Sequence, residues 1–325
     1  MPKVYVTRRV PEASVELLRS VAEVRQWDSD DVVPRSVLLQ EVADCDGLFC
    51  LLTERIDDEL LDRAPRLKVV ANMAVGYDNI DVAAVTRRGI VATNTPGVLT
   101  ETSADLAWAL ILATARRVVE GVDFVRAGKW KTWGPMLLLG HDVHHATLGV
   151  IGLGRIGFEV AKRSIGFDMK VLYHNRRRRP DVEQQYGWQY ADLPTLLRES
   201  DIVTIHTDYN PSSHHLIGRE QLQMMKRTAY LINTARGPIV DNMALAEALE
   251  QGWIAGAGLD VTDPEPIPLD HPLTKLPNCV ILPHIASASV ATRTRMATLA
   301  AENIVAVLQG KRPPTPINPE VLEGR

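Results

Sequence analysis

TLGVIGLGRIG, residues 147–157, decides the fold expected for this chain. Its first half is a short apolar run, which is typical of a buried parallel strand. After the run, apolar residues recur at Ile156, Val160, Ala161 and Ile165, the spacing of a helix with one apolar face. The three glycines of the G-x-G-x-x-G pattern therefore lie where a strand turns into a helix.

Each of these glycines has its own physical reason. Gly152 allows a tight turn, Gly154 lets an anion approach the backbone, and Gly157 lets the helix pack closely on the strand. The N–H groups at the start of the helix, aided by the helix dipole, favour a pyrophosphate. We therefore predict a dinucleotide-binding, Rossmann-like domain. The alternative is a glycine-rich turn without a ligand, and the flanking strand and helix disfavour it.

The residues after the next predicted strand, 169–174, indicate which dinucleotide binds. An NAD-binding protein usually has Asp or Glu there, about 20 residues past the glycines, to hold the ribose 2′-hydroxyl. This chain has Asn175 followed by four arginines. Asparagine removes the repulsion of a 2′-phosphate, and Arg176 and Arg177 add attraction. We predict that NADP(H) is preferred and NAD(H) is possible, and we interpret the last two arginines as part of a solvated turn.

Composition narrows the class of protein. A chain of 325 residues is long enough for two domains, and a net charge of −4 implies no nucleic-acid or membrane partner. The three cysteines form no C-x-x-C pair, so a reducing compartment is the simpler inference. The start of the chain lacks the apolar stretch of a signal peptide, and the apolar segment 106–115 is too short to span a bilayer. We expect a soluble, cytoplasmic protein.

Strands and helices are expected to alternate on both sides of the glycine motif, which predicts two α/β domains with parallel sheets. A turn cluster at 94–97 marks a hinge. After it we expect one long helix over about 100–127, apolar enough to be buried or to lie at a subunit interface. The other expected strands are 3–7, 23–27, 47–52, 67–73, 201–206, 229–233, 255–261 and 279–282. The other expected helices are 11–21, 34–42, 57–63, 193–198, 219–225, 242–251 and 290–309.

Three polar residues follow predicted strands of the second half of the chain, where ligands bind in such sheets. They are Arg236, Glu265 and His284. An arginine fork suits a substrate carboxylate, and histidine suits the delivery of a proton near neutral pH. A nearby glutamate stabilises the imidazolium and orients its ring. Together these residues fit reduction of a 2-oxo acid, although each alone could be structural.

Three histidines, at 141, 144 and 145, are of a residue type that can bind a metal ion. No cysteine and no acidic cluster beyond Asp142 accompanies them, so we expect surface or interface histidines and no metal.

Six stretches of the chain resemble the D-isomer-specific 2-hydroxyacid dehydrogenases, and the resemblance is nearest to glyoxylate/hydroxypyruvate reductases. It extends over essentially the whole chain and is far more specific than the glycine motif alone. The stretches are NMAVGYDNIDV (72–82), TNTPGVLTETSADLA (93–107), TLGVIGLGRIG (147–157), LINTARGPIVD (231–241), AGLDVTDPEPIP (257–268) and CVILPHIASAS (279–289).

The resemblance implies roles for individual residues. Arg236 binds the substrate, Glu265 is the partner of the acid/base His284, and the N–H groups of Val75 and Gly76 hold the substrate carboxylate. Without the resemblance, the sequence of the turn at Val75 and Gly76 favours an ordinary left-handed turn over an anion site. The implied cofactor contacts are Ser103, Gly152, Leu153, Gly154, Arg155, Ile156, Asn175, Arg176, Arg177, Thr234, Ala235, Arg236, Asp260 (facing the carboxamide), His284 and Ala286.

The resemblance also implies the organisation of the molecule. A discontinuous substrate-binding (catalytic) domain comprises 1–98 and 287–325, and a dinucleotide-binding Rossmann domain comprises 99–286. The two Rossmann-like or flavodoxin-like domains are expected to flank a cleft, and a homodimer is expected to form through the cofactor domain. Two departures from the family pattern are Asp208, where proline is usual, and Ala286, where glycine is common.

The predicted function is NADPH-preferring reduction of glyoxylate and hydroxypyruvate, with His284 as proton donor. One alternative is another activity of the same family, such as that of a D-lactate-type or phosphite dehydrogenase. Another is a non-catalytic protein that senses nucleotides, since such relatives often retain the catalytic residues.

Overall fold

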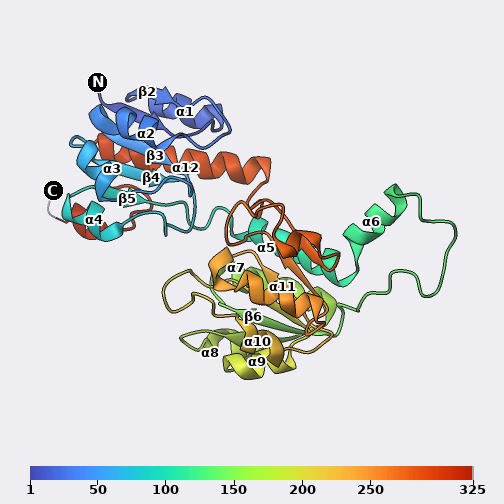
Figure 1. Ribbon diagram of the computed structural model, residues 1–325. Coiled ribbons are helices and arrows are strands. Elements are labelled where there is room, and N and C mark those ends of the chain that lie inside the picture. The colour runs from blue at the N-terminus through green and yellow to red at the C-terminus, as the bar shows by residue number, and fades with distance from the viewer. Residues whose placement is uncertain (324–325) are drawn as a thin grey trace. The chain divides into compact units, whose positions relative to one another are not determined.

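The computed structural model describes residues 1–323 and divides into two compact units. Unit 1 comprises Met1–Leu99 and the chain from Ala288 onward, and unit 2 comprises Thr100–Ser287. The chain therefore leaves unit 1, forms unit 2 and returns to unit 1 (Figure 1).

Unit 1 is built on a five-stranded sheet in the order β2-β1-β3-β4-β5, with every neighbouring pair parallel (Figure 1). This is the strand order of the flavodoxin-like sheets. Its strands are β1 (Lys3–Val6), β2 (Glu23–Gln26), β3 (Gly47–Cys50), β4 (Val69–Asn72) and β5 (Val91–Thr93). Its helices are α1 (Glu12–Arg19), α2 (Arg35–Glu41), α3 (Asp58–Arg63), α4 (Val82–Arg87) and α12 (Val290–Leu308).

Unit 2 is built on a seven-stranded parallel sheet in the order β12-β11-β10-β9-β6-β7-β8. Strand order reverses between β6 and β9, the place where α/β sheets of this kind bind ligands. Its strands are β6 (Thr147–Ile151), β7 (Lys170–His174), β8 (Gln189–Tyr190), β9 (Ile202–Ile205), β10 (Tyr230–Asn233), β11 (Gly256–Leu259) and β12 (Cys279–Ile281). Its helices are α5 (Thr100–Ala115), α6 (Val118–Arg126), α7 (Arg155–Arg163), α8 (Pro180–Tyr186), α9 (Leu193–Glu199), α10 (Arg219–Met224) and α11 (Asn242–Glu250).

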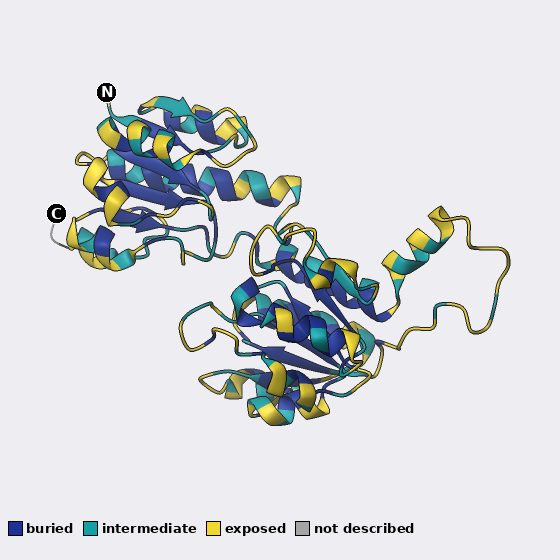
Figure 2. Ribbon diagram, in the orientation of Figure 1, coloured by how far each residue is buried: buried dark blue, intermediate teal, exposed yellow. Residues whose placement is uncertain are grey.

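The expected α/β class with two parallel sheets is thus confirmed. The central strands of a parallel sheet are covered on both faces, which explains their continuous apolar sequences. All four residues of β3, and all four of β9, are buried. Buried strands with half-exposed helices around them are visible in each unit in Figure 2. Within residues 1–323, no helix has the length and apolar character needed to cross a membrane.

The single long helix expected over 100–127 was wrong. The structure has two helices, α5 and α6, separated at Arg117, whose backbone is left-handed with φ 52°. The carbonyl of Ala115 accepts a hydrogen bond from the N–H of His141 at 3.0 Å, so a returning segment replaces the next turn of helix. A contact across 26 residues of sequence has no counterpart in helical periodicity, which is a local property.

Four further elements, α4, β5, α8 and β8, were not predicted. They are short, from two to seven residues, and β8 is exposed along its whole length. Such segments have too few apolar residues to establish a period, so tertiary pairing defines them.

Candidate active site

The glycine turn between β6 and α7 fits a bound pyrophosphate. Gly152 has φ +94°, and a Cβ there would lie 2.6 Å from the backbone of His206. A Cβ on Gly157 would lie 2.1 Å from the carbonyl oxygen of Gly152. A Cβ on Gly154, in contrast, would meet nothing within 4 Å. The first and third glycines are therefore required by packing, and the second leaves the start of the helix open to an anion.

Asn175, directly after β7, is tied to this turn. Its Oδ1 accepts a hydrogen bond from the N–H of Leu153 at 2.6 Å. The side chain that replaces the usual acidic residue is thereby fixed beside the glycine turn, where the ribose of a dinucleotide is expected. Arg155 is exposed at the start of α7, and Ile156 is half-buried next to it.

The four arginines after Asn175 divide into two pairs. Arg178 forms an ion pair with Glu183 at 2.6 Å, and Arg179 forms one with an aspartate of α8, also at 2.6 Å. Arg176 and Arg177 are exposed, and neither forms an ion pair with any residue of the described chain 1–323. Only the first two guanidinium groups are therefore free to attract a further negative charge.

Arg236, Glu265 and His284 follow three neighbouring strands, β10, β11 and β12, at the same edge of the sheet. Glu265 and His284 are in direct contact there. His284 Nδ1 lies 2.6 Å from Glu265 Oε1. The charges of His284 and Arg236 both act on the Glu265 carboxylate. Because Nδ1 is occupied by the glutamate, Nε2 of the imidazole is the nitrogen that can reach a substrate.

Asp260, the residue after β11, holds the backbone on which His284 is carried. Its carbonyl oxygen accepts the N–H of His284 at 3.0 Å. Its two carboxylate oxygens accept the N–H groups of Ile285 at 2.8 Å and Ala286 at 2.7 Å. His284 has φ 54°, a conformation that non-glycine residues rarely adopt, and these three hydrogen bonds stabilise it. Burial raises the pKa of Asp260 even though two N–H groups donate to it.

The electrostatics of Glu265 combine two opposing influences. Burial is the largest influence on the pKa of its carboxyl group and acts to raise it. The hydrogen bond from His284 and the charge of that imidazole act in the other direction, and the pKa ends below its ordinary value. Glu265 is therefore ionised near neutral pH.

Asn233, the last residue of β10, was not singled out from the sequence. Its side chain donates to the carbonyl of Arg236 at 2.9 Å and accepts the N–H of Ala235 at 3.0 Å. It is buried, and it fixes the short loop that also carries Thr234, whose hydroxyl has no partner within residues 1–323. An uncharged polar residue at the end of a buried strand was the available indication of this role. The remaining predicted cofactor residue, Ser103, is buried in the first part of α5.

His206, after β9, was also missed. Its backbone lies against Gly152, and its Nε2 is 2.8 Å from the hydroxyl of Thr204. Burial lowers its pKa to about 3, so this imidazole is neutral at physiological pH.

In unit 1, the predicted substrate-binding residues Val75 and Gly76 follow β4. Both are half-exposed, and the N–H groups of Val75, Gly76 and Tyr77 donate to no acceptor within residues 1–323. Three consecutive N–H groups without an acceptor are available to an anion, which is the first requirement of a backbone anion site.

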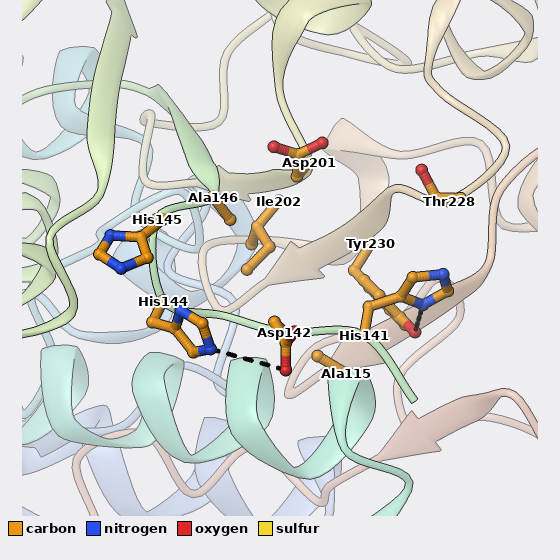
Figure 3. Close-up of a pocket in the computed structure, with 10 residues that line it drawn as sticks. All are labelled: Ala115, His141, Asp142, His144, His145, Ala146, Asp201, Ile202, Thr228 and Tyr230. Atoms are coloured by element: carbon orange, nitrogen blue, oxygen red, sulfur yellow. Dashed lines mark hydrogen bonds and ion pairs between the residues drawn. The ribbon is translucent and has the colours of Figure 1, made fainter. Parts of the chain in front are cut away.

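A cavity of about 240 Å³ lies at the opposite edge of the unit 2 sheet (Figure 3). Its lining includes Ala146 and Asp201, which immediately precede β6 and β9. His141 Nδ1 there lies 2.8 Å from the hydroxyl of Tyr230. Within residues 1–323, no group of three or more His, Cys, Asp or Glu side chains is arranged to hold a metal ion. The cavity lies at the amino ends of the strands, whereas Arg236, Glu265 and His284 follow their carboxyl ends. It is therefore not part of the candidate active site.

Comparison with known proteins gives consistent results. Residues 108–286 match the family described as D-isomer specific 2-hydroxyacid dehydrogenase, NAD binding domain. The glyoxylate reductase of Korarchaeum cryptofilum is 52% identical over 325 residues, which are 100% of this chain and 98% of that protein. The TT0316 protein of Thermus thermophilus superposes with a TM-score of 0.92 and 50% identity, covering 97% of this chain and 99% of that one. The NADPH-dependent glyoxylate/hydroxypyruvate reductase of Sinorhizobium meliloti, in complex with NADP and malonate, superposes with a TM-score of 0.84 and 33% identity, covering 97% and 96%.

The lowered pKa of Glu265 predicts how pH affects stability. A carboxyl group with a depressed pKa in the folded state stabilises the protein above its unfolded pKa, and this contribution is lost as pH falls through the folded value. The difference in free energy of unfolding between the wild type and Glu265→Gln should shrink as pH falls below about 5. Urea denaturation over a pH series measures this difference. A difference that grows on acidification would contradict the lowered pKa of Glu265.

Proposed function

The chain belongs to the D-isomer specific 2-hydroxyacid dehydrogenase family of NAD(P)-dependent oxidoreductases acting on CH–OH groups, and we propose that it reduces glyoxylate to glycolate and hydroxypyruvate to D-glycerate, with NADPH preferred. The observation that carries this proposal is the contact between His284 Nδ1 and Glu265 Oε1 at 2.6 Å, on the same sheet edge as Arg236. The names of the similar proteins support glyoxylate as a substrate.

The side chains supply the proton and the binding of the substrate. Glu265 orients the imidazole through its contact with Nδ1, so that Nε2 of His284 donates a proton to the 2-oxo oxygen as it becomes a hydroxyl. Arg236 binds the carboxylate and polarises the neighbouring carbonyl group. When bound, a dihydronicotinamide cofactor would supply the hydride for the carbonyl carbon. The added hydride and proton together convert the 2-oxo acid to a 2-hydroxy acid.

We propose that residues 99–286 hold the cofactor and that residues 1–98 with 287–325 bind the substrate. The open Gly154 and the start of α7 fit the pyrophosphate. The N–H groups of Val75 and Gly76 bind the substrate carboxylate. The proposed cofactor-binding residues are Ser103, Gly152, Leu153, Gly154, Arg155, Ile156, Asn175, Arg176, Arg177, Thr234, Ala235, Arg236, Asp260, His284 and Ala286.

The preference for NADPH is proposed from charge at the end of β7. Asn175 is neutral, and Arg176 and Arg177 have no competing ion pair within the described chain. A 2′-phosphate therefore meets no carboxylate at this position and two available guanidinium groups.

A homodimer is proposed to form through α6 and the segment after it. These residues project from the body of unit 2 in Figure 1. No residue of α6 is buried, although Val118, Val122 and Val125 are apolar, and Trp130 and Trp133 beyond it are 60% and 79% exposed. An isolated short helix is marginal in water, and an exposed apolar surface marks an interface. A second copy of the chain would cover it by two-fold symmetry.

His284→Ala is expected to lower the rate of NADPH oxidation by glyoxylate at least about a hundredfold, because a positioned acid contributes roughly 10²–10⁴-fold. The Kd for NADPH should remain nearly unchanged. NADPH absorbance measures the rate, and fluorescence titration measures the Kd. His144→Ala, at the opposite sheet edge, is the matched control. Full activity of His284→Ala would remove this residue from the mechanism, and wild-type protein that binds NADPH but reduces no 2-oxo acid would refute the proposed function.

Asn175→Asp is expected to shift the ratio of kcat/KM for NADPH over NADH toward NADH by about a hundredfold, as one introduced charge near a phosphate predicts. The new carboxylate can still accept the N–H of Leu153, so the turn should stay intact. Arg178→Ala is the control, because that guanidinium is already paired with Glu183. Initial rates with both cofactors measure the ratio. An unchanged ratio in Asn175→Asp would show that this position does not select the cofactor.

Val125→Asp is expected to convert a dimer into a monomer, because two buried carboxylates would face the interface without partners. Val32→Asp, at an exposed valine of unit 1, is the control and should leave the assembly unchanged. Sedimentation velocity gives the mass of each. A wild-type protein that sediments as a monomer would exclude this interface.

A further inference from the structure

We infer that Asn94 and Asn72 are positioning residues for the substrate: they hold the peptide planes of residues 75–77 so that consecutive N–H groups face the substrate carboxylate. This inference rests on the proposed role of Val75 and Gly76 and adds the N–H of Tyr77 to it. All the contacts that support it lie within unit 1.

Each of the three peptide groups in this loop has its carbonyl oxygen occupied. The carbonyl of Ala74 accepts the N–H of Thr95 at 2.8 Å. The carbonyl of Val75 accepts the side-chain amide of Asn94 at 2.7 Å. The carbonyl of Gly76 accepts the side-chain amide of Asn72 at 2.9 Å.

Because the peptide bond is planar, these hydrogen bonds to the carbonyl oxygens also fix the directions of the N–H groups. In a trans peptide the C=O and the following N–H point in opposite directions. Fixing the carbonyl of Val75 therefore fixes the N–H of Gly76, and fixing the carbonyl of Gly76 fixes that of Tyr77. The N–H groups of Val75, Gly76 and Tyr77 are also the ones that find no acceptor within residues 1–323. The loop thus has its acceptors satisfied and its donors available, as an anion site requires.

Both asparagines are themselves held by the surrounding fold. Asn72 is fully buried at the end of β4 and also contacts the side-chain oxygen of Asn79 at 3.3 Å. Asn79 in turn donates to the carbonyl of Leu51 at 3.0 Å and to that of Glu54 at 2.9 Å, which ties the loop after β3 to the substrate-binding loop.

Asn94 is held by the C-terminal segment. Its carbonyl accepts the hydroxyl of Thr315 at 2.6 Å, and that hydroxyl also accepts the side-chain amide of Asn303, buried on α12, at 2.8 Å. The part of the chain that returns to unit 1 therefore supports the residue that orients Gly76. Asn94 is held in place through its own backbone carbonyl, by Thr315 and α12. Loss of its side-chain amide should therefore change anion binding more than it changes the fold.

The test combines binding and kinetics. Oxalate, a dicarboxylate that resembles glyoxylate and is not reduced, is titrated into the NADPH-bound protein by calorimetry. For Asn94→Ala we expect the Kd for oxalate and the KM for glyoxylate to rise by about tenfold or more, which is the loss of one well-oriented donor to a charged group. The kcat should change less than about threefold, because the substrate carboxylate is bound alike in the ground state and the transition state. The KM for NADPH should stay constant, because this loop is not among the proposed cofactor contacts.

Thr95→Val is the matched control in the same segment. Its hydroxyl is buried without a partner within residues 1–323, and valine keeps the backbone N–H that binds Ala74. This variant should bind oxalate as the wild type does. Unchanged oxalate Kd and glyoxylate KM in folded Asn94→Ala would overturn the inference.

Asn94→Asp gives a readout that a purely structural role would not produce. At neutral pH the introduced carboxylate cannot donate to the carbonyl of Val75, whereas its protonated form can. As pH is lowered from about 8 to about 5, oxalate binding to Asn94→Asp, relative to wild type, should recover and exceed that of Asn94→Ala, because a carboxyl group beside a carbonyl in a half-buried site has a raised pKa. If Asn94→Asp stays no better than Asn94→Ala at the lowest pH, the donor role is wrong.

These measurements separate the two proposals. If the wild type reduces no 2-oxo acid but binds oxalate, and Asn94→Ala weakens that binding, the proposed function fails and the positioning role stands. If the wild type is an active reductase but does not bind oxalate, or binds it equally in Asn94→Ala, the function stands and the positioning role fails.

Discussion

Asp260 accepts hydrogen bonds from three consecutive residues, His284 to Ala286, and the position of the imidazole depends on them. The carboxylate is buried, which raises its pKa, and its two oxygens each pair with a backbone N–H. This arrangement offsets the cost of a left-handed histidine backbone and directs the side chain toward Glu265. It also joins two neighbouring strands, because Asp260 follows β11 and His284 follows β12. A polar group buried for such a purpose stabilises one conformation of the site more than it stabilises the fold as a whole.

We propose that backbone N–H groups bind an anion in each unit, and the two units leave these groups available by different means. In unit 2, Gly152 and Gly157 allow a turn that no larger residue could form, and the start of α7 is left open. In unit 1, asparagine side chains occupy the carbonyl oxygens of the loop after β4, so the donors on the other side of each peptide are available. The arrangement in unit 2 follows from the glycines of the turn itself. The arrangement in unit 1 depends on side chains from the ends of two neighbouring strands, β4 and β5, which meet only in the folded sheet.

Tertiary contacts reduce the charge that the basic segment after β7 can offer to a ligand. Four successive arginines form a strong local charge. Two of them, Arg178 and Arg179, are neutralised by acidic residues of α8, a helix that the sequence did not predict. Exposed ion pairs of this kind contribute little to stability, but they remove two guanidinium groups from competition for a ligand. The effective charge beside Asn175 is therefore that of Arg176 and Arg177.

The sequence alone determined the α/β class, the glycine turn and the positions of Arg236, Glu265 and His284 after strands, because apolar runs, helical spacing and strand ends are local properties. It did not determine that α5 ends at Ala115, since a hydrogen bond from His141 interrupts the helix. Nor did it determine the roles of Asn72, Asn94 and Asn233, because an asparagine at a strand end has the same local pattern whether it faces solvent or a carbonyl. Only the tertiary structure decided which buried amide meets which peptide, since hydrogen bonds depend on distance and direction between segments far apart in the chain.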